Sequence, residues 1–269
     1  MAHASDHSSV NDLGAIFPTA DFQFRMTMRR GRPVDFFQPR DAALLQERMR
    51  WVNEAPTRYA QMMPGFEPLL AEASRLGESW GLPPVTNAIE LAMNWEPDAL
   101  LLSRDADGGF RLRGGAGCFL TGWALEEKLG LTLSEIHGVV PGLNPAIGRA
   151  IDQFLCGLQP GVALHRDNWG IAATEELNMH PSRGLPSPQL PVVLSQLWLR
   201  VEHQALVALP ETRGVLFGIR IALHRLDAIA ANETVAAGLA RALQTMPPEL
   251  ARYKRLDTVR DELIAALKR

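Results

Sequence analysis

The sequence predicts an α/β domain in which a mostly antiparallel sheet is flanked by N-terminal and C-terminal helices. Two β-hairpin patterns carry the sheet. Residues 100–119 turn at Asp105-Ala106-Asp107-Gly108-Gly109, and residues 196–224 turn at Pro210-Glu211-Thr212-Arg213. Helical patterns stand before the first hairpin, between the two hairpins and after the second. Strands joined by such short turns pair antiparallel, which leaves the helices to pack against the sheet.

The N-terminal part is expected to contain an arm, one short strand and three helices. Residues 1–20 are polar and lack the basic and apolar regions of a secretory signal, so we expect a flexible arm before a single domain of residues 21–269. Residues 22–28 alternate in the manner of a strand. Asp41 is placed to cap a helix that runs to residue 52. Two further helices are expected at residues 64–80 and 86–95.

The glycine-rich stretch that ends the first hairpin invites a nucleotide-binding interpretation. Gly115 and Gly117 begin a GxG pattern, but Leu120 stands where the third glycine would be. The GxxxxG spacing that starts at Gly117 is followed by Trp123 and Ala124 instead of the Lys-Ser/Thr pair of a phosphate-binding loop. A glycine-rich turn is therefore the favoured interpretation.

Residues 122–171, between the hairpins, contain the most informative local pattern. Thr132 and Glu135 form a capping box, which begins a helix of little more than one turn that ends at His137 and Gly138. An imidazole at a helix end, followed by a glycine, can project into a cavity. A helix at residues 123–129 precedes this element, and an amphipathic helix at 145–158 and a strand at 162–171 follow it.

His137 has two interpretations from its residue type alone. It is either a structural histidine or a ligand. No second ligand stands at metal spacing, so one imidazole cannot hold zinc. One imidazole can hold heme, because the porphyrin supplies the four equatorial ligands.

The second hairpin carries a row of polar side chains. Arg200, Glu202 and Gln204 alternate with apolar residues and therefore share one side of their strand. They form either a solvated sheet face or the wall of a pocket. Before this hairpin, residues 174–191 contain four prolines and form a long irregular connection, of the kind that often covers a site. Helices at residues 233–243, 248–253 and 256–267 follow the hairpin.

Composition excludes several classes of function. With 269 residues, of which 46% are hydrophobic and 21% charged, the chain can bury a large core. A net charge of −3 argues against a nucleic-acid surface, and no apolar run approaches the ~20 residues of a membrane span. Two cysteines outside any CxxC motif indicate no disulfide framework, so a reducing, cytoplasmic location is expected.

Two blocks of the sequence resemble the heme-binding catalytic subunit of the heme-dependent oxidative N-demethylase family. The first block matches the W…EK-G…IH-x-PVP…R-x-NW signature of that family. The second matches its LRVE-x-Q-x-L strand at residues 199–206, the next strand at 214–220 and a C-terminal Tyr253-Lys254 pair. The resemblance covers nearly the whole chain and is clearest over residues 117–269. The matching residues of the first block are Trp123, Glu127, Lys128, Gly130, Ile136, His137, Val140, Pro141, Arg166, Asn168 and Trp169.

The resemblance implies a PAS-like fold that binds one heme b, since the sequence has no CxxCH motif for covalent attachment. It implies that His137 is the axial iron ligand, whose other ring nitrogen then donates to a carbonyl or carboxylate. Arg166 is the main candidate for pairing a heme propionate. Lys128, Arg200 and Asn168 are further cofactor-binding candidates. The residues expected on the substrate side are Glu202, Arg220, Gln204 and Trp169.

The reaction implied by the resemblance is oxidative N-demethylation of a small amine. Glu202 and Trp169 are expected to hold the protonated substrate, because an ammonium needs a carboxylate or an aromatic face. The reaction consumes dioxygen and electrons and releases formaldehyde. The sequence has no recognisable flavin, nicotinamide or iron–sulfur motif, so a partner reductase with a flavin or iron–sulfur centre is expected to supply the electrons.

Four positions depart from the family pattern. Val139 replaces the first proline of PVP, His203 replaces an arginine, and Ile221 and Ala222 replace a Thr-Tyr pair. His203 is also a rival iron ligand, although strand alternation places it opposite Glu202. Two other functions stay open: a PAS-like heme sensor or binding module without demethylase activity, and a heme-free subunit that keeps only the fold.

Overall fold

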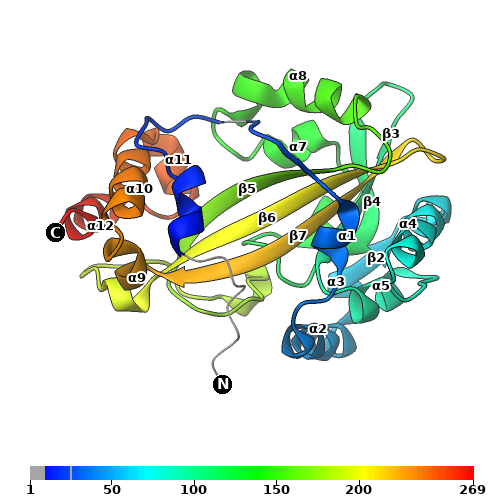
Figure 1. Cartoon of the computed structure of the whole chain (residues 1–269), viewed down its shortest axis with the longest axis horizontal. Coiled ribbons are helices and arrows are strands. Elements are labelled where there is room, and N and C mark those ends of the chain that lie inside the picture. The colour runs from blue at the N-terminus through cyan, green and yellow to red at the C-terminus, as the bar shows by residue number, and fades with distance from the viewer. Residues whose placement is uncertain (1–9, 25) are drawn as a thin grey trace.

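The strands of this computed structural model, which describes residues 10–24 and 26–269, form one sheet (Figure 1). In the described chain, seven strands are paired in the order β1-β5-β6-β7-β3-β4-β2, and every neighbouring pair is antiparallel. The predicted α/β class with an antiparallel sheet is therefore confirmed. The strands are β1 Arg29–Gly31, β2 Ala60–Met62, β3 Asp98–Arg104, β4 Phe110–Ala116, β5 Ala163–Ala172, β6 Trp198–Leu209 and β7 Gly214–Arg225.

The two predicted hairpins are confirmed and form the middle of the sheet. β3 turns into β4 at residues 105–109, and β6 pairs with β7 from Trp198↔Arg225 to Leu209↔Gly214. β7 also pairs with β3, so the two hairpins adjoin. Between β4 and β5 the chain forms α6 Leu125–Lys128, α7 Leu133–His137 and α8 Leu143–Cys156. The five long strands therefore lie in the sheet in the order β4-β3-β7-β6-β5. If these five are counted from the first to the fifth along the chain, this order is 2-1-5-4-3.

Helices cover both faces of this sheet. On one face, Ile136 of α7 and Ile147 and Ile151 of α8 pack in the same apolar cluster as Leu206 of β6 and Ile219 of β7. The opposite face holds an N-terminal and a C-terminal group of helices, each over its own apolar cluster. These helices are α1 Pro33–Phe37, α2 Ala42–Glu54, α3 Pro56–Tyr59, α4 Glu67–Ser79 and α5 Ala88–Asn94, then α9 Leu226–Ala230, α10 Glu233–Thr245, α11 Pro248–Tyr253 and α12 Arg260–Leu267.

Most predicted helices form where side-chain caps and apolar periodicity coincide. Asp41 caps α2 by accepting a hydrogen bond from the Ala43 N–H at 2.8 Å. The capping box of α7 is present in both directions: Thr132 Oγ1 accepts from the Glu135 N–H at 3.1 Å, and Glu135 Oε2 accepts from the Thr132 N–H at 2.7 Å. The short elements α1, α3, α9 and β2 were not predicted, because three to five residues carry too little periodicity.

The predicted strand at residues 22–28 is wrong. The described residues of that segment form no strand, and pairing with β5 begins only at Arg29. The alternation has another cause, because Phe22 and Phe24 pack against Met246 and Leu250, while Met26 and Met28 pack with the cluster under α7 and α8. A segment without strand pairing that packs every second side chain against the protein therefore has the same alternating sequence pattern as a strand.

Part of the segment expected to be a flexible N-terminal arm is packed against the rest of the protein. Residues 1–9 lie outside the described part of the chain, but Val10–Ala15 forms a 3₁₀ helix, η1. Leu13 and Phe17 are buried against the C-terminal helices, and a Cβ on Gly238 of α10 would lie 2.0 Å from the Phe17 carbonyl oxygen. The packed chain thus begins by residue 10 instead of residue 21.

The predicted glycine-rich turn at the end of the first hairpin is only partly correct, because residues 117–122 form an irregular connection after β4, whereas the glycines before them lie in the strand. Gly114 and Gly115 lie inside β4, between β2 and β3. A Cβ on Gly115 would lie 2.2 Å from the Ala99 carbonyl oxygen, and one on Gly114 would lie 2.6 Å from that of Gln61. These glycines therefore permit a close approach of three backbones, which is a recognised reason for glycine in a strand.

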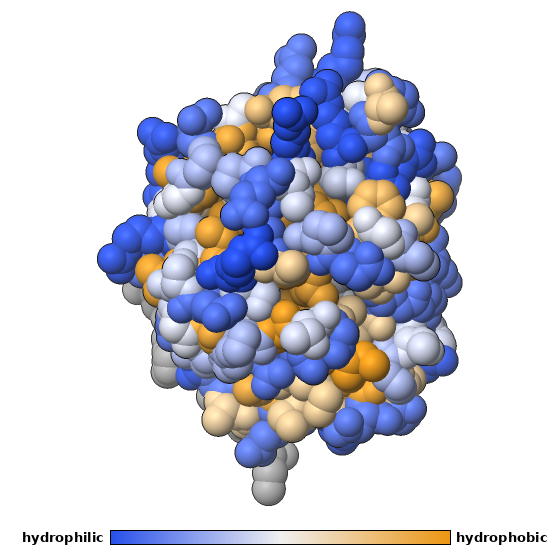
Figure 2. Space-filling model, turned by 90° about the vertical axis from the view of Figure 1, so that its right-hand side faces the viewer, coloured by the Kyte–Doolittle hydropathy of each residue, from blue (hydrophilic) through white to orange (hydrophobic). Residues whose placement is uncertain are grey.

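The side of the protein drawn in the space-filling view (Figure 2) has a surface of both polar and apolar residues. In the view of Figure 2 it is mostly hydrophilic, with small scattered hydrophobic areas. Within the described part of the chain, none of the helices combines the length and the apolar character that crossing a bilayer requires. Large exposed hydrophobic side chains occur at Ile89, Val139, Leu190, Val193 and Tyr253.

Candidate functional site

The polar row of β6 faces the interior, under α7 and α8. Glu202 and Gln204 are buried, and in the register Asn168 lies opposite Glu202 while Arg166 lies opposite Gln204. Residues paired directly across antiparallel strands share a face of the sheet. Arg166, Asn168, Glu202 and Gln204 therefore line one surface, and the interpretation of a solvated sheet face is wrong.

Glu202 is held by two amides that bind the same oxygen atom. Gln204 Nε2 donates to Glu202 Oε2 at 2.8 Å, and Asn168 Nδ2 donates to the same atom at 3.2 Å. Oε1 receives no hydrogen bond from any residue that the structure describes. A carboxylate can accept about four hydrogen bonds, so Oε1 is available to a ligand that carries N–H groups.

Arg166 is a largely buried cation that lacks a hydrogen-bonded anion among the described residues. Its Nε is buried and makes no hydrogen bond there. Burial lowers the pKa of the guanidinium, and the charges of Glu202 and Asp167 oppose this effect without pairing directly with it. A buried charge without a partner costs free energy, so this arrangement favours the binding of an anionic group beside Arg166.

His137 is the last residue of α7 and is partly buried. Burial, and secondly the positive charge of Arg166, lower the pKa of its imidazole from 6.5 to about 4. The ring is therefore neutral at physiological pH, which is the state that can bind a metal ion. Because the charge of Arg166 lowers the pKa of His137, the imidazole interacts electrostatically with the polar row of the sheet.

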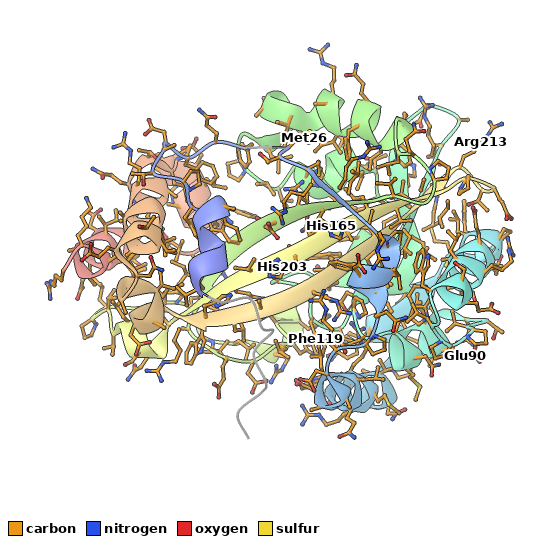
Figure 3. All side chains as sticks on the ribbon, viewed as in Figure 1. Met26, Glu90, Phe119, His165, His203 and Arg213 are labelled. Atoms are coloured by element: carbon orange, nitrogen blue, oxygen red, sulfur yellow. The ribbon has the colours of Figure 1, made fainter. Side chains whose placement is uncertain are left out.

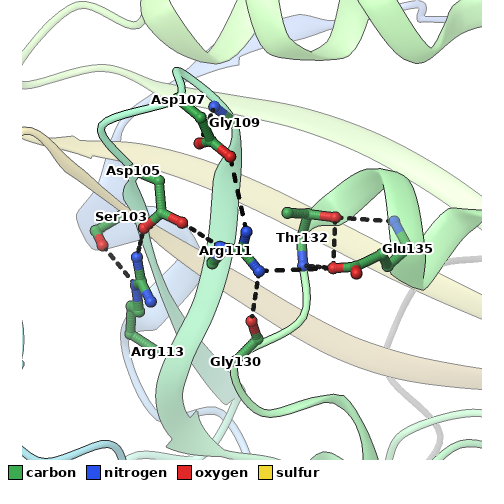
Figure 4. Close-up of polar contacts among 9 residues, drawn as sticks. All are labelled: Ser103, Asp105, Asp107, Gly109, Arg111, Arg113, Gly130, Thr132 and Glu135. Carbon is green, nitrogen blue, oxygen red and sulfur yellow. Dashed lines mark hydrogen bonds and ion pairs between the residues drawn. The ribbon is translucent and has the colours of Figure 1, made fainter.

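A network of charged groups fixes α7 against the first hairpin (Figure 4). Arg111 of β4 donates to the Gly130 carbonyl oxygen at 3.1 Å, and its Nη1 lies 3.6 Å from Glu135 Oε2, the carboxylate of the capping box. Arg111 and Arg113 both pair with Asp105 at the hairpin turn. The helix that ends in His137 is thus held at its first turn, although it is little more than one turn long.

A small pocket of about 90 Å³ opens between α7 and α8 and includes His137. The expected hydrogen bond from the His137 ring to a carbonyl or carboxylate is not formed with any described residue. The pocket nevertheless brings polar groups to the ring. Its lining residues are Leu133, Ser134, His137, Asn144, Gly148, Ile151 and Asp152.

Lys254 and Tyr253 border the same site and received no role from the sequence. β1 pairs with β5 only as far as His165, and beyond that point Lys254 Nζ donates to the Trp169 carbonyl oxygen at 2.7 Å. Burial lowers the pKa of Lys254 to about 8, while the negative charge of Glu202 acts in the opposite direction. Burial, and secondly Glu202, raise the pKa of Tyr253. The Tyr253-Lys254 pair in the second block was the available signal.

Trp169 and Arg220 are not brought to this surface. Trp169 follows Asn168 by one residue and packs on the opposite face, with its ring centroid 5.1 Å from that of Phe17. Arg220 lies on the opposite face as well, where it pairs with Glu96 and donates to the Phe36 carbonyl oxygen at 2.7 Å. The expectation that both line the pocket of Glu202 is therefore not supported, since each has a packing role elsewhere.

His203 also lies on the opposite face, as the alternation predicted. Its Nδ1 lies 2.7 Å from Asp167 Oδ1, and Asp167 pairs with Arg29 of β1 at 2.7 Å. His165 and His203 lie on this same side of the sheet (Figure 3). His203 is thus separated from His137 by the sheet itself.

Arg200 and Lys128 differ in what they offer a cofactor. Arg200 is buried, and it donates to the carbonyl oxygens of Phe119 and Leu177 at 2.6 and 2.8 Å and to Thr121 Oγ1 at 3.0 Å. Because the guanidinium of Arg200 donates to these three oxygens, its role is to hold the loop that contains Leu177 and precedes β6, and it has less capacity to bind a cofactor. Lys128 ends α6 and makes no ion pair with another described residue.

Replacing Lys254 by methionine is expected to remove a pH dependence from the free energy of unfolding. With a pKa of about 8 in the folded chain and 10.5 ordinarily, the unfolded chain binds more protons between these values. The stability of the wild type should therefore rise with pH across this window, and below it Lys254 should add no pH dependence, because both states are then fully protonated. Urea unfolding from about pH 7 to about pH 10.5 measures this, and parallel profiles of wild type and Lys254→Met would contradict it.

Comparison with known proteins identifies the family. The family described as "Haem-dependent oxidative N-demethylase, alpha subunit-like" matches residues 25–264. The match includes both hairpins, α6 to α8 and the Tyr253-Lys254 pair, and therefore all of the candidate residues described above. A match over most of the chain fixes membership, and the protein belongs to the heme-dependent oxidative N-demethylase alpha-subunit-like family.

Proposed function

We propose that this protein binds a b-type heme through His137 and carries out the oxidative N-demethylation of a small amine. One observation carries the proposal. A neutral imidazole, a guanidinium without a hydrogen-bonded anion among the described residues and a carboxylate whose Oε1 has no donor among them interact electrostatically on one face of the sheet. These are the three groups that a heme iron, a heme propionate and a protonated amine require.

The residues present fit a heme in three respects. His137 is neutral, and the buried Nε of Arg166 lacks a partner among the described residues. Of the residues that line the pocket, Leu133 and Ile151 are apolar and supply part of the hydrophobic lining that a porphyrin needs. The sheet order and the helices inserted between β4 and β5 support a PAS-like fold. The absence of a CxxCH motif supports non-covalent attachment and hence heme b.

Each residue has a defined task in the proposed reaction. His137 holds the iron through a neutral nitrogen, and Arg166 pairs with a propionate. The bound heme supplies dioxygen activation. Glu202 accepts an N–H of the protonated amine at Oε1, while Asn168 and Gln204 keep its Oε2 in place. Glu202 is itself buried, which strengthens the interaction between its carboxylate and an ammonium.

A partner protein supplies the electrons in this proposal. The description of the family as alpha-subunit-like implies a partner subunit. The sequence has no motif for a flavin, a nicotinamide or an iron–sulfur cluster, so a reductase that carries a flavin or an iron–sulfur centre is the proposed donor. Cys118 and Cys156 are both free, which supports a reducing and hence cytoplasmic compartment.

Formaldehyde release tests the proposed function. The purified protein with NADPH, dioxygen and dimethylamine is expected to release none, and addition of a flavin and iron–sulfur reductase should start the reaction. Turnover without a reductase would overturn the partner requirement. Reversible binding of a gas or an amine, without oxidation under any competent reductase, would favour the heme sensor instead.

Replacing Arg166 by alanine is expected to accelerate heme loss by about 10- to 100-fold. This is the scale of removing one hydrogen bond to a charged group, about 1.5–3 kcal/mol. Transfer of heme to an acceptor protein, followed by absorption, measures the rate. The spectrum of the bound heme should not change, because the axial ligand is intact. An unaltered rate would assign Arg166 a purely structural role.

A further inference from the structure

Asn144 has a buried acceptor without a partner in the pocket that contains His137. Its Nδ2 donates to the Ser134 carbonyl oxygen at 2.8 Å, which links α8 to α7. Its Oδ1 is buried and makes no hydrogen bond with any described residue. Both Asn144 and His137 line the pocket between these helices. The amide nitrogen of Asn144 therefore links α8 to α7, while its oxygen has no hydrogen-bond donor among the described residues.

The orientation of this amide is fixed by its neighbours. The Ser134 carbonyl oxygen can only accept, so the nitrogen of the Asn144 amide must face it and the oxygen must face the pocket. Gly148, one turn further along α8, keeps this space open, since a Cβ there would lie 3.4 Å from Oδ1. A buried acceptor that is left unsatisfied costs about 1–3 kcal/mol. A linkage between α7 and α8 alone does not require that cost.

We propose that Asn144 Oδ1 accepts a hydrogen bond from the ring nitrogen of His137 that does not bind the metal. The inference rests on the proposed function and adds a positioning residue to it. A direct bond is not formed in the structure, so the proposal requires a rotation of the imidazole ring toward Asn144 Oδ1. Such a partner fixes the tautomer and the orientation of the imidazole and raises its basicity toward the iron.

Asp152 is the rival partner. It lies on α8 and lines the same pocket, and a carboxylate is a stronger acceptor than an amide. Asp152 is partly exposed, so water can satisfy it, whereas Asn144 Oδ1 is closed to solvent and lacks a partner among the described residues. The uncompensated acceptor favours Asn144.

Two substitutions of Asn144 test the proposal, because they act in opposite directions. Asn144→Leu keeps the shape and removes the acceptor. The ferrous iron–histidine stretching frequency, read by resonance Raman, should fall, the midpoint potential should rise, and heme loss should accelerate by roughly 10- to 100-fold. Asn144→Asp supplies a stronger acceptor, so the frequency should rise and the potential should fall. Gln153→Ala, exposed on the same helix, is the control and should change neither value.

The outcomes separate this inference from the proposed function. Both Asn144 variants lose the hydrogen bond to Ser134, so a purely structural role would shift them in the same direction and overturn the inference. A shift in Asp152→Asn that equals that of Asn144→Leu, with no shift in the Asn144 variants, would assign the role to Asp152. If the wild type binds heme through His137 and no variant shifts, only the inference fails. If the wild type binds no heme, the proposed function fails with it.

Discussion

The His137→Ala variant is expected to lose the Soret band of the bound heme or to show the band of a weakly ligated heme. His137 is close enough to Arg166, which lies on the face with Glu202, for the charge of Arg166 to lower its pKa, while His165 and His203 lie on the other side of the sheet (Figure 3). Without the imidazole, the iron would lose the neutral ring nitrogen that the proposal assigns to it. Absorption after reconstitution with hemin measures the result.

His203→Ala is the matched control for this experiment. His203 pairs with Asp167, which in turn pairs with Arg29 of β1, so its loss should affect the docking of β1 and leave the heme spectrum unchanged. Loss of the Soret band in His203→Ala and its retention in His137→Ala would reverse the assignment. Addition of free imidazole to His137→Ala should restore a ligated spectrum, which separates loss of the ligand from loss of the fold.

The structure narrows the meaning of the four departures from the family pattern. Val139 is exposed, His203 lies on the opposite face, and Ala222 is buried under the C-terminal helices. Ile221 alone lies opposite Glu202 on the candidate face, where it packs with the cluster under α8. Three of the four changes therefore leave the residues around Glu202 untouched, and Ile221 is the position at which substrate selection is expected to differ from the family pattern.

The parts of the fold that were predicted correctly depend on local signals. Caps, turn residues and strand alternation located both hairpins and α7, and alternation placed Arg200, Glu202 and Gln204 together. Alternation also separates Asn168 from Trp169, but the family motif names these neighbours together, and both were expected at the site, Asn168 toward the cofactor and Trp169 toward the substrate. Arg220 was misplaced because the register of β6 on β7 sets Ile221, and not Arg220, opposite Glu202.

The contacts that could not be predicted join distant segments. Lys254 reaches the Trp169 carbonyl oxygen across 85 residues, at the point where β5 no longer pairs with β1. No periodicity marks such a contact, since it depends on how α11 packs against the edge of the sheet. The same holds for Asn144, whose unused oxygen is visible only when the packing of α7 on α8 is known.

The Glu202→Gln variant is expected to bind protonated amines about 10- to 100-fold more weakly, which corresponds to a charge-assisted hydrogen bond of about 1.5–3 kcal/mol. Glutamine keeps the size of the side chain but removes the negative charge. It also replaces one acceptor oxygen by an NH₂ group, which can only donate. This group cannot accept the hydrogen bonds that the amides of Asn168 and Gln204 now donate to Glu202 Oε2. Titration of the heme spectrum with dimethylamine measures the affinity.

Two comparisons distinguish an ammonium-binding role from a purely structural one. Glu249→Gln, exposed on α11, removes an equal charge from the surface and should leave the affinity unchanged. Glu202→Gln should also lower the pKa of Lys254 further, because the carboxylate now raises it against the effect of burial. A neutral ligand such as carbon monoxide should bind both variants as it binds the wild type, since it makes no demand on the carboxylate. Equal loss of affinity for the neutral ligand and the amine would show that Glu202 supports the site through packing, and an unchanged amine affinity would remove Glu202 from substrate binding.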